Sequence, residues 1–186
     1  HANPFRTVTA FRRKCEALGV SVRSRAPVTR IRRTHGSWLV DTPAGTFEAP
    51  VVVNCAGAWG GRVAELLGES PVPLEAQAPM LMISERMPAF VQPVVGAQGR
   101  TLSFKQFANG TVLVGGGHRG RAEPETNTTH LDYRQLAINA QTARAIFPIM
   151  SRARVVRCWA GIEGVMPDAI PVVGAGREHG VYHAFG

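Results

Sequence analysis

The segment that most restricts the fold is residues 51–62, VVVNCAGAWGGR. Residues 51–53 are a run that is apolar on both faces, which is typical of a strand buried in a parallel sheet. A turn of small residues at 54–57 follows, and apolar residues then recur at helical spacing up to Gly68. Open α/β folds hold the phosphates or rings of a nucleotide cofactor with such a strand–turn–helix unit. An ordinary strand–helix connection has the same pattern, so this segment alone leaves both interpretations open.

Composition places the chain among globular proteins. Of its 186 residues 45% are hydrophobic, and no apolar run approaches the roughly 20 residues of a membrane span, so we expect no transmembrane span. Cys15, Cys55 and Cys158 are few and far apart, which excludes a disulfide framework and a paired-cysteine zinc site. We therefore expect no metal and a cytoplasmic location. The opening residues have neither an initiator Met nor a targeting pattern, so we interpret the chain as the middle of a longer sequence.

The charge balance bears on the possible partners. A net charge of +8 is compatible with nucleic acid or an anionic surface as a partner. Only residues 23–33 are dense in basic side chains, and there these side chains alternate with Val28 and Ile31. Alternation indicates one solvated face of a strand, so we expect no nucleic-acid partner.

Hydrophobic periodicity predicts helices and short strands along the whole chain. Asn3 and Pro4 are a favourable N-cap and first residue for an amphipathic helix that ends at Gly19. A second amphipathic helix spans 133–147 and ends at Pro148. Strands are expected at 19–22, 28–32, 37–41, 46–49, 80–83, 91–95, 101–107, 111–115, 155–159, 170–173 and 181–183.

Turn residues indicate how these strands are arranged. The strands at 28–49 form an antiparallel meander, and those at 101–115 form a hairpin around Asn109-Gly110, where positive φ is favoured. A polar loop is expected from the triglycine at 115–117 through Asn127. Helices and buried strands at both ends, with antiparallel strands between them, predict an α/β layer interrupted by an α+β insertion.

Four motifs in order resemble one family of flavoproteins. They are Asn-Cys-Ala-Gly-Ala-Trp at 54–59, Gly-Gly-Gly at 115–117, Trp-Ala-Gly at 159–161 and Pro-Asp-x-x-Pro-Val-Val-Gly at 167–174. In this combination the sequence resembles the D-amino-acid oxidase (DAO) family, in its glycine or sarcosine oxidase or its opine or D-amino-acid dehydrogenase branch. The opening helix and the meander also fall where that family has them, so the resemblance covers nearly the whole chain.

The resemblance implies a fold, a cofactor and a reaction. Residues 1–72 and 155–186 would be parts of a Rossmann-like FAD-binding domain, and residues 73–154 an inserted antiparallel substrate-binding sheet with a helix. The reaction implied is oxidation of the C–N bond of a small amine or amino acid to an imine, with FAD taking the hydride. Which amine is oxidised, and whether oxygen or another carrier receives the electrons, stay open.

The resemblance also implies where the cofactor and substrate lie. The backbone of Val28 would follow the adenine, and the small-residue turn would border the pyrophosphate or ribityl chain. The cofactor-binding residues implied are Val28, Cys55, Ala56, Gly57, Trp59 and Gly161. The candidate substrate-binding residues, on strands of the inserted sheet or at their ends, are Lys105, Gln106, His118 and Arg119. No residue is assigned a catalytic role.

Three departures from the family pattern matter. The Gly-x-Gly-x-x-Gly turn of a first strand and the acidic ribose ligand that the family uses would precede His1. Glu163 stands near where relatives often have a carboxylate-binding Arg, which favours a cationic or differently oriented substrate. The alternative to a fragment of a flavoenzyme is therefore a non-catalytic α/β module that binds a partner subunit and no flavin by itself.

The 186-residue chain by itself is expected to bind FAD weakly or not at all. Without the helix N-terminus of the first Gly-rich turn, the pyrophosphate lacks its strongest anchor. The flavin absorbance of the chain, purified in the presence of FAD, measures this. A stoichiometrically yellow protein would contradict the expectation.

Overall fold

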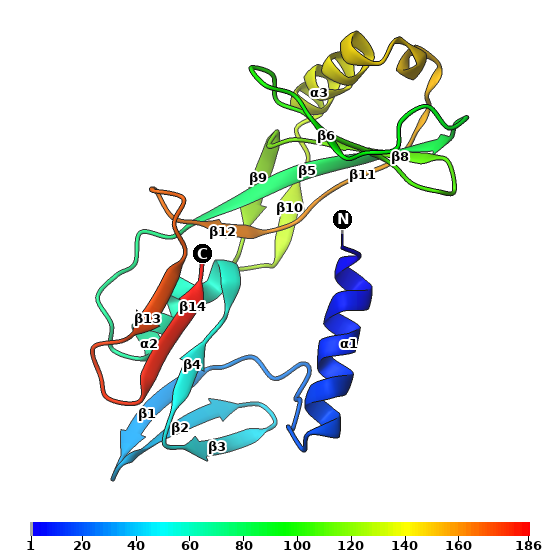
Figure 1. Ribbon diagram of the computed structural model, residues 1–186. Helices are drawn as coiled ribbons and strands as arrows, with labels where there is room; N and C mark the ends of the chain where they lie inside the picture. Colours follow the sequence, from blue (N-terminus) through cyan, green and yellow to red (C-terminus); the bar gives the residue numbers. More distant parts are fainter. Residues whose placement is uncertain (1) are drawn as a thin grey trace. The chain divides into compact units, whose positions relative to one another are not determined.

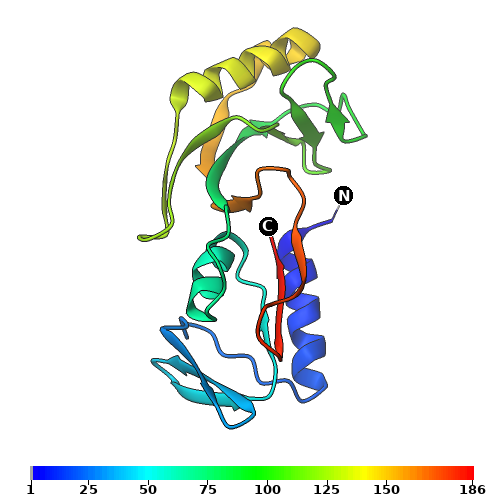
Figure 2. The same cartoon turned by 90° about the vertical axis from the view of Figure 1, so that its left-hand side faces the viewer.

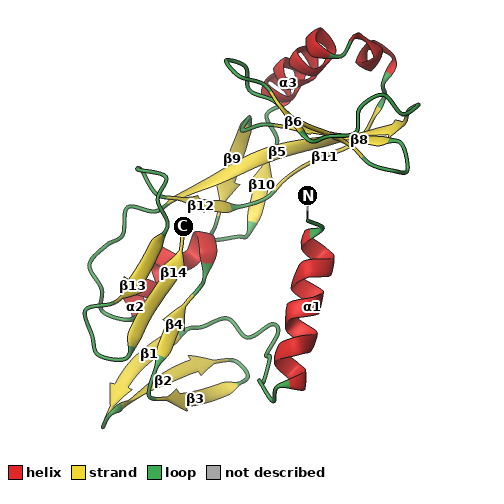
Figure 3. Cartoon of the chain, viewed as in Figure 1, coloured by secondary structure: helices red, strands yellow, loops and turns green. Residues whose placement is uncertain are grey.

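The computed structural model describes residues 2–186 and divides into two compact units, His1–Val52 and Val53–Gly186. Each unit combines helix with strands, and the sheets of known register are antiparallel, so the predicted α/β plus α+β class is confirmed (Figures 1 and 3). The domain boundaries at 72 and 154 stay a prediction. The helices are α1 (Pro4–Ala17), α2 (Gly60–Leu66) and α3 (Tyr133–Ile146), with 3₁₀ turns η1 (Gly57–Trp59) and η2 (Pro148–Arg152).

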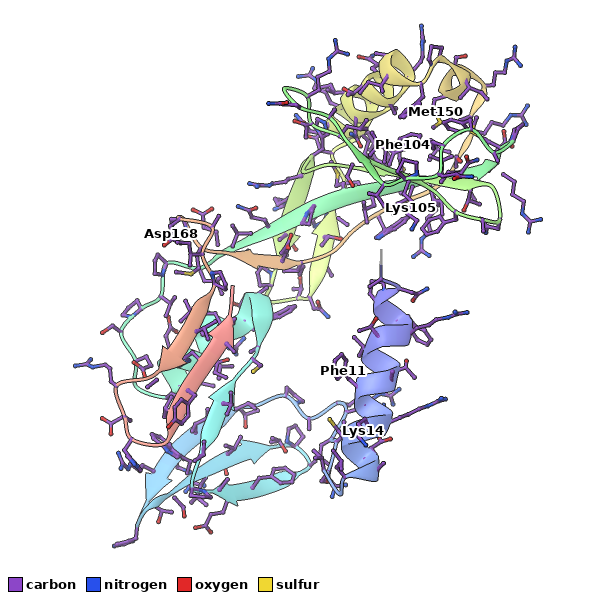
Figure 4. All side chains as sticks on the ribbon, viewed as in Figure 1. Phe11, Lys14, Phe104, Lys105, Met150 and Asp168 are labelled. Carbon is purple, nitrogen blue, oxygen red and sulfur yellow. The ribbon has the colours of Figure 1, made fainter. Side chains whose placement is uncertain are left out.

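Helix α1 begins where the sequence predicts. The side chain of Asn3 accepts a hydrogen bond from the backbone N–H of Arg6 at 3.1 Å, and Pro4 occupies the first turn. The apolar positions of the helix are not covered: Phe5 and Phe11 are 80% and 69% exposed. Figure 4 labels Phe11 on this helix. The amphipathic pattern therefore forms the helix within Pro4–Ala17 without burying any residue of it.

The first unit also contains the predicted meander. Its strands are β1 (Arg30–Thr34), β2 (Ser37–Thr42) and β3 (Gly45–Ala49), in the order β1-β2-β3. Arg32 donates to Asp41 across β1 and β2 at 3.0 Å, and this bond holds the pKa of Asp41 below its ordinary value. The strand predicted at 19–22 is wrong, because these residues pair with no strand of the described chain. β1 begins at Arg30, so Val28 lies in the loop before it.

The second unit is built on a sheet of eight strands. The path of hydrogen-bonded pairs is β10-β9-β5-β8-β7-β6, in which β8 and β9 share one edge of β5, and β11 and β12 pair with its other edge. The strands are β5 (Glu75–Arg86), β6 (Val95–Gly96), β7 (Ser103–Gln106), β8 (Thr111–Gly115), β9 (Arg119–Glu123), β10 (Thr128–His130), β11 (Val155–Ala160) and β12 (Glu163–Val165).

Three sequence expectations for this sheet need correction. The strand expected at 91–95 is reduced to Val95–Gly96, where it pairs with β7. The polar loop expected through Asn127 is instead a hairpin of β9 and β10, with Asn127 at φ +53 between them. Strand β12 is also absent from the prediction. Short edge strands with polar side chains lack the period-2 hydrophobic pattern on which a prediction depends.

The triglycine at 115–117 allows both β8 and β9 to pair with one edge of β5. Met82 pairs with Val114 of β8, and Ala78 pairs with Gly120 of β9. Between them, Gly116 and Gly117 adopt positive φ, +127 and +92, which glycine adopts without strain. A Cβ on Gly116 would lie 2.6 Å from the backbone of Leu102, so the position also requires the absence of a side chain.

Helix α3 covers one face of this sheet (Figures 1 and 2). Along β5 burial alternates, so that Met80 and Met82 are buried while Leu81 and Ile83 are half-buried. Phe104 of β7 is fully buried on the α3 side and stacks on Phe147 with 4.5 Å between ring centroids. The core therefore lies between the sheet and α3, and the opposite face of the sheet is partly exposed.

A third sheet contains the strand of the valine run. Its strands are β4 (Val52–Asn54), β13 (Val172–Ala175) and β14 (Val181–Phe185), in the order β13-β14-β4. The expectation that 51–53 is buried on both faces is wrong, since Val51 and Val53 are 47% and 57% exposed. Val53 therefore points to a face of the sheet that is not covered, and Val51 precedes the strand.

Truncation of Phe104 tests the position of the core. Phe104→Ala is expected to lower the free energy of unfolding by about 3–5 kcal/mol, because it empties a buried, aromatic-lined position. Phe107→Ala, on the opposite face of the same hairpin and half-buried, is the matched control and should cost clearly less. Urea unfolding followed by circular dichroism measures both. Equal losses would contradict the assignment of the faces.

Candidate functional site

The turn after β4 is held by one buried side chain. Asn54 is 2% exposed, and its Oδ1 accepts a hydrogen bond from the backbone N–H of Ala56 at 3.2 Å. Its Nδ2 donates to the carbonyl of Gly60 at 2.8 Å. Gly57 then adopts φ +54 and leads into η1 and α2. The asparagine thus closes the backbone into the compact bend that the sequence predicts.

Strand β12 lies directly against this turn. A Cβ placed on Gly164 would lie 2.9 Å from Cα of Ala58 and 3.2 Å from the carbonyl oxygen of Gly57. Trp59 is held by the loop between β9 and β10, where its Nε1 donates to the carbonyl of Pro124 at 3.0 Å. The turn is therefore fixed to the large sheet by a backbone approach and by one tryptophan.

The structure leaves most of the predicted cofactor-binding residues accessible. Cys55 and Gly57 are exposed and Ala56 is half-buried. Gly161, between β11 and β12, is exposed, and a Cβ there would meet nothing within 4 Å. Val28 belongs to the other compact unit, where it is half-buried in a loop. The structure thus brings Cys55, Ala56, Gly57 and Trp59 together in one turn.

The face of the large sheet opposite α3 is called the open face below. Residues directly opposite each other on antiparallel strands point to the same side of a sheet. One row across it is Lys105, Leu113, Ile83 and Arg157, from β7, β8, β5 and β11. This row crosses three strand spacings, about 14 Å. A neighbouring row includes Leu81 and Trp159, which pair across β5 and β11.

The two polar neighbours on β7 lie on opposite faces. Figure 4 shows Lys105 and Phe104 on opposite sides of the sheet, so Lys105 is on the open face. Gln106 is buried on the α3 side, where its Oε1 accepts from the backbone N–H of Phe90 and its Nε2 donates to the carbonyl of Pro88, both at 2.9 Å. Of this predicted pair, only Lys105 is positioned to meet a ligand on the open face.

His118 and Arg119 are separated in the same way. His118 Nδ1 lies 2.8 Å from Oε1 of Gln135 on α3. Arg119 pairs with Pro79 of β5 at the open face and is exposed. Glu163 pairs with Gln77 two residues further toward the start of β5, so it belongs to the same face. Arg119 and Glu163 are thus candidates for substrate contact, and His118 faces the helix.

Sequence reasoning did not include Arg157 and Trp159 among the candidate site residues. A register shift between Val155 and Arg157 sets the phase of β11, and Arg157 and Trp159 then share the open face. The Arg157 guanidinium lies 5.6 Å from the centroid of the Trp159 ring, and Lys105 Nζ lies 5.5 Å from that of Phe107. Cys158 between them packs toward the core, and burial raises the pKa of its thiol. The alternation of side chains along residues 155–160 was the sequence signal that could have placed Arg157 and Trp159 on one face.

Comparison with known proteins identifies the family. The family model described as FAD dependent oxidoreductase (DAO) matches residues 1–186. The chain belongs to the DAO family of FAD-dependent oxidoreductases. It is 25% identical over 174 residues to the HcnC subunit of hydrogen cyanide synthase of Pseudomonas protegens, covering 92% of this chain and 40% of that protein. To the beta subunit of sarcosine oxidase of Rhizobium meliloti it is 27% identical over 169 residues, covering 88% and 38%.

Solved structures agree with the DAO fold. L-proline dehydrogenase from P. horikoshii superposes with a TM-score of 0.86 at 22% identity, over 100% of this chain and 50% of that one. Glycine oxidase from Geobacillus kaustophilus gives a TM-score of 0.80 at 21% identity, over 92% and 45%. The chain thus spans about two fifths to one half of the length of these relatives, and the resemblance noted from the motifs is confirmed.

Membrane-spanning helices and metal-binding clusters are both absent from the described part of the chain. In residues 2–186, no helix combines the length and the apolar character needed to cross a membrane. Within the same described residues, no three His, Cys, Asp or Glu side chains are grouped so that they would hold a metal ion.

A glycine pair tests the contact between β12 and the turn. Gly164→Ala is expected to lower the free energy of unfolding by about 1–3 kcal/mol, since the new methyl group collides with the Gly57–Ala58 backbone. Gly161→Ala, three residues earlier and facing open space, is the control and should change it by less than about 0.5 kcal/mol. Chemical denaturation followed by tryptophan fluorescence checks both, and a tolerated alanine at 164 would refute the contact.

Proposed function

We propose that the protein containing this chain oxidises the C–N bond of a small amine or amino acid to an imine, which water then hydrolyses. The observation that carries the proposal is the exposed small-residue turn, which β12 packs against the end of a partly apolar sheet face. Membership of the DAO family supports FAD as the cofactor. Names of relatives, such as sarcosine oxidase and opine oxidase, support an amine or amino acid as the substrate.

The described residues fit a dinucleotide flavin. The backbone from Cys55 to Gly57 is accessible, and Gly57 and Gly161 present no side chain to an approaching phosphate or ring. When bound, FAD supplies the hydride acceptor. In the proposal the turn holds the pyrophosphate or ribityl chain, and Leu81 and Trp159 of the open face pack against a flat ring and exclude water. Val28 keeps its proposed position along the adenine.

The charges of the open face bear on the substrate. Lys105 and Arg157 stand at the two ends of one cross-strand row, with Leu113 and Ile83 between them. We assign Lys105 to a carboxylate of the substrate, because charge-assisted hydrogen bonds to carboxylates are strong. Glu163 pairs with Gln77, about 20 Å along β5 from the row of Lys105, so it is nearest the turn and lies too far away to bind the amine of the same small substrate. In this proposal a cation elsewhere on the open face takes the role of the carboxylate-binding Arg that relatives often have near position 163.

A second candidate function is binding of a partner protein within an enzyme assembly. The apolar side chains of α1 are exposed, Phe5 and Phe11 above all, and exposed apolar patches often mark interfaces. Several relatives are named as subunits of larger enzymes, namely hydrogen cyanide synthase, sarcosine oxidase and opine oxidase. We propose that the complete protein is a cytoplasmic enzyme that works in such an assembly. A module without flavin is the alternative.

The test is a screen with the full-length protein. Under anaerobic conditions, the protein loaded with FAD is mixed with sarcosine, proline, glycine, D-amino acids and opines, and flavin absorbance is followed. Bleaching by at least one of these amines is the expected result. If the protein binds FAD but no amine bleaches it, C–N oxidation is refuted; if it binds no FAD, the partner-binding module is supported.

The role of Lys105 is tested with Lys14, the other lysine of the sequence, as control. Lys105→Met is expected to raise KM for a carboxylate-bearing substrate about 10–100-fold, because a charge-assisted hydrogen bond contributes about 1.5–3 kcal/mol. Lys14→Met, on α1, should leave KM unchanged. Steady-state kinetics of both variants with FAD bound provide the measurement, and equal KM values would remove Lys105 from the site.

Thiol labelling tests the position of the cofactor. Cys55 is exposed and should react quickly with a maleimide in the protein without flavin, whereas the half-buried Cys158 should react slowly, because burial raises its pKa. Saturating FAD is expected to slow the labelling of Cys55 at least about 10-fold if the turn borders the cofactor. Peptide mass spectrometry reads each cysteine separately. Unchanged labelling of Cys55 on FAD binding would place the cofactor elsewhere.

A further inference from the structure

A buried polar chain connects the turn to the last strand. His183 of β14 is 8% exposed, and its Nδ1 lies 3.3 Å from Nδ2 of Asn54. Its Nε2 lies 3.4 Å from Oε1 of Glu69, just beyond α2, whose side chain is 11% exposed. These residues are far apart in the sequence, His183 and Glu69 by 114 positions. The fold thus brings three polar side chains together beneath the candidate cofactor turn.

The backbone decides the orientation of the Asn54 amide. The N–H of Ala56 can only donate and the carbonyl of Gly60 can only accept, which fixes Oδ1 toward Ala56 and Nδ2 toward Gly60. Nδ2 therefore also faces His183, and an amide nitrogen only donates. Nδ1 of His183 must accept this bond, so its ring carries the proton on Nε2. That proton points at Glu69, whose Oε1 also accepts from the backbone N–H of Arg177 at 2.8 Å.

Two glycines lie in close contact with this group of side chains. A Cβ on Gly176 would collide with Glu69 and lie 3.0 Å from Nε2 of His183. A Cβ on Gly60 would collide with the ring of Phe185, which stacks edge-on against the His183 ring at 5.6 Å. The backbone of Gly60 and Gly176 thus lies in close contact with this group of side chains, while Glu69 and His183 also line an open pocket on their other side.

We propose that His183, as the neutral Nε2–H tautomer held by Glu69, is the positioning residue for the 54–57 turn and through it for the cofactor. Without an acceptor at Nδ1, one amide hydrogen of the buried Asn54 has no partner, which is costly. The Asn54 side chain is then held only by its bonds to Ala56 and Gly60, so the hydrogen bond from the Ala56 N–H to Oδ1 opens more often. The link to the cofactor rests on the proposed function; the link to the turn does not.

Two conservative variants separate positioning from simple packing. His183→Asn keeps a side-chain oxygen near the Nδ1 position and loses the contact with Glu69. His183→Gln reaches Glu69 and has no acceptor near Nδ1. In the full-length protein, amide hydrogen exchange at Ala56 is expected to rise at least about 10-fold in His183→Gln and less than about 3-fold in His183→Asn. Val181→Ala, also buried on β14, controls for general destabilisation and should leave Ala56 relatively protected.

Each result bears on a separate part of the proposal. Ring ¹⁵N shifts of His183 should report the Nε2–H tautomer, and an Nδ1–H tautomer would overturn the proposal. Equal exchange at Ala56 in the Asn and Gln variants would also overturn it. With FAD, His183→Gln should weaken binding at least about 10-fold and His183→Asn should not. If the unaltered protein binds no FAD, the proposed function fails, while the exchange at Ala56 still decides the role of His183 in the turn.

Discussion

The structure of the second unit depends on the pairing of one long strand along both of its edges. β5 has twelve residues, and β8 and β9 follow one edge while β11 and β12 follow the other. Pairing on both sides satisfies the backbone of β5 and fixes the phase of its alternation. Its Met80 and Met82 then face α3, and Leu81 and Ile83 face away from it.

The same pairing positions the candidate site. Because β12 continues along β5 beside the end of the open face, Gly164 comes within contact of the Gly57–Ala58 backbone. The turn that the DAO family would use for its cofactor is thereby attached to the sheet face proposed for the substrate. His183 and Asn54 hold the turn from the other side. The cofactor and substrate positions that we propose thus both depend on strands of the sheet, which are more rigid than loops.

Features that depend on local sequence could be predicted. The helix capped by Asn3 and the hairpin at Asn109-Gly110 are encoded by neighbouring residues, and both form. The hairpin of β9 and β10 was missed because its strands are polar and form only against β5. The valine run at 51–53 was misjudged because apolar composition does not reveal whether both faces of a strand are covered.

The site could be predicted only in part, for a related reason. Motif order was sufficient for the family and for the 54–59 turn. Which of Lys105 and Gln106 lies on the open face depends on the register of β7 with β8. The contact between Glu69 and His183 depends on the complete fold, because no pattern links residues 114 positions apart.

The most direct test of the account is a crystal structure of the full-length protein with FAD bound. The account predicts the pyrophosphate or ribityl chain in contact with the backbone of Cys55 to Gly57, and the flavin ring against the open face near Leu81 and Trp159. An FAD bound at another surface, or an open face covered by the protein's own side chains in the complex, would contradict it.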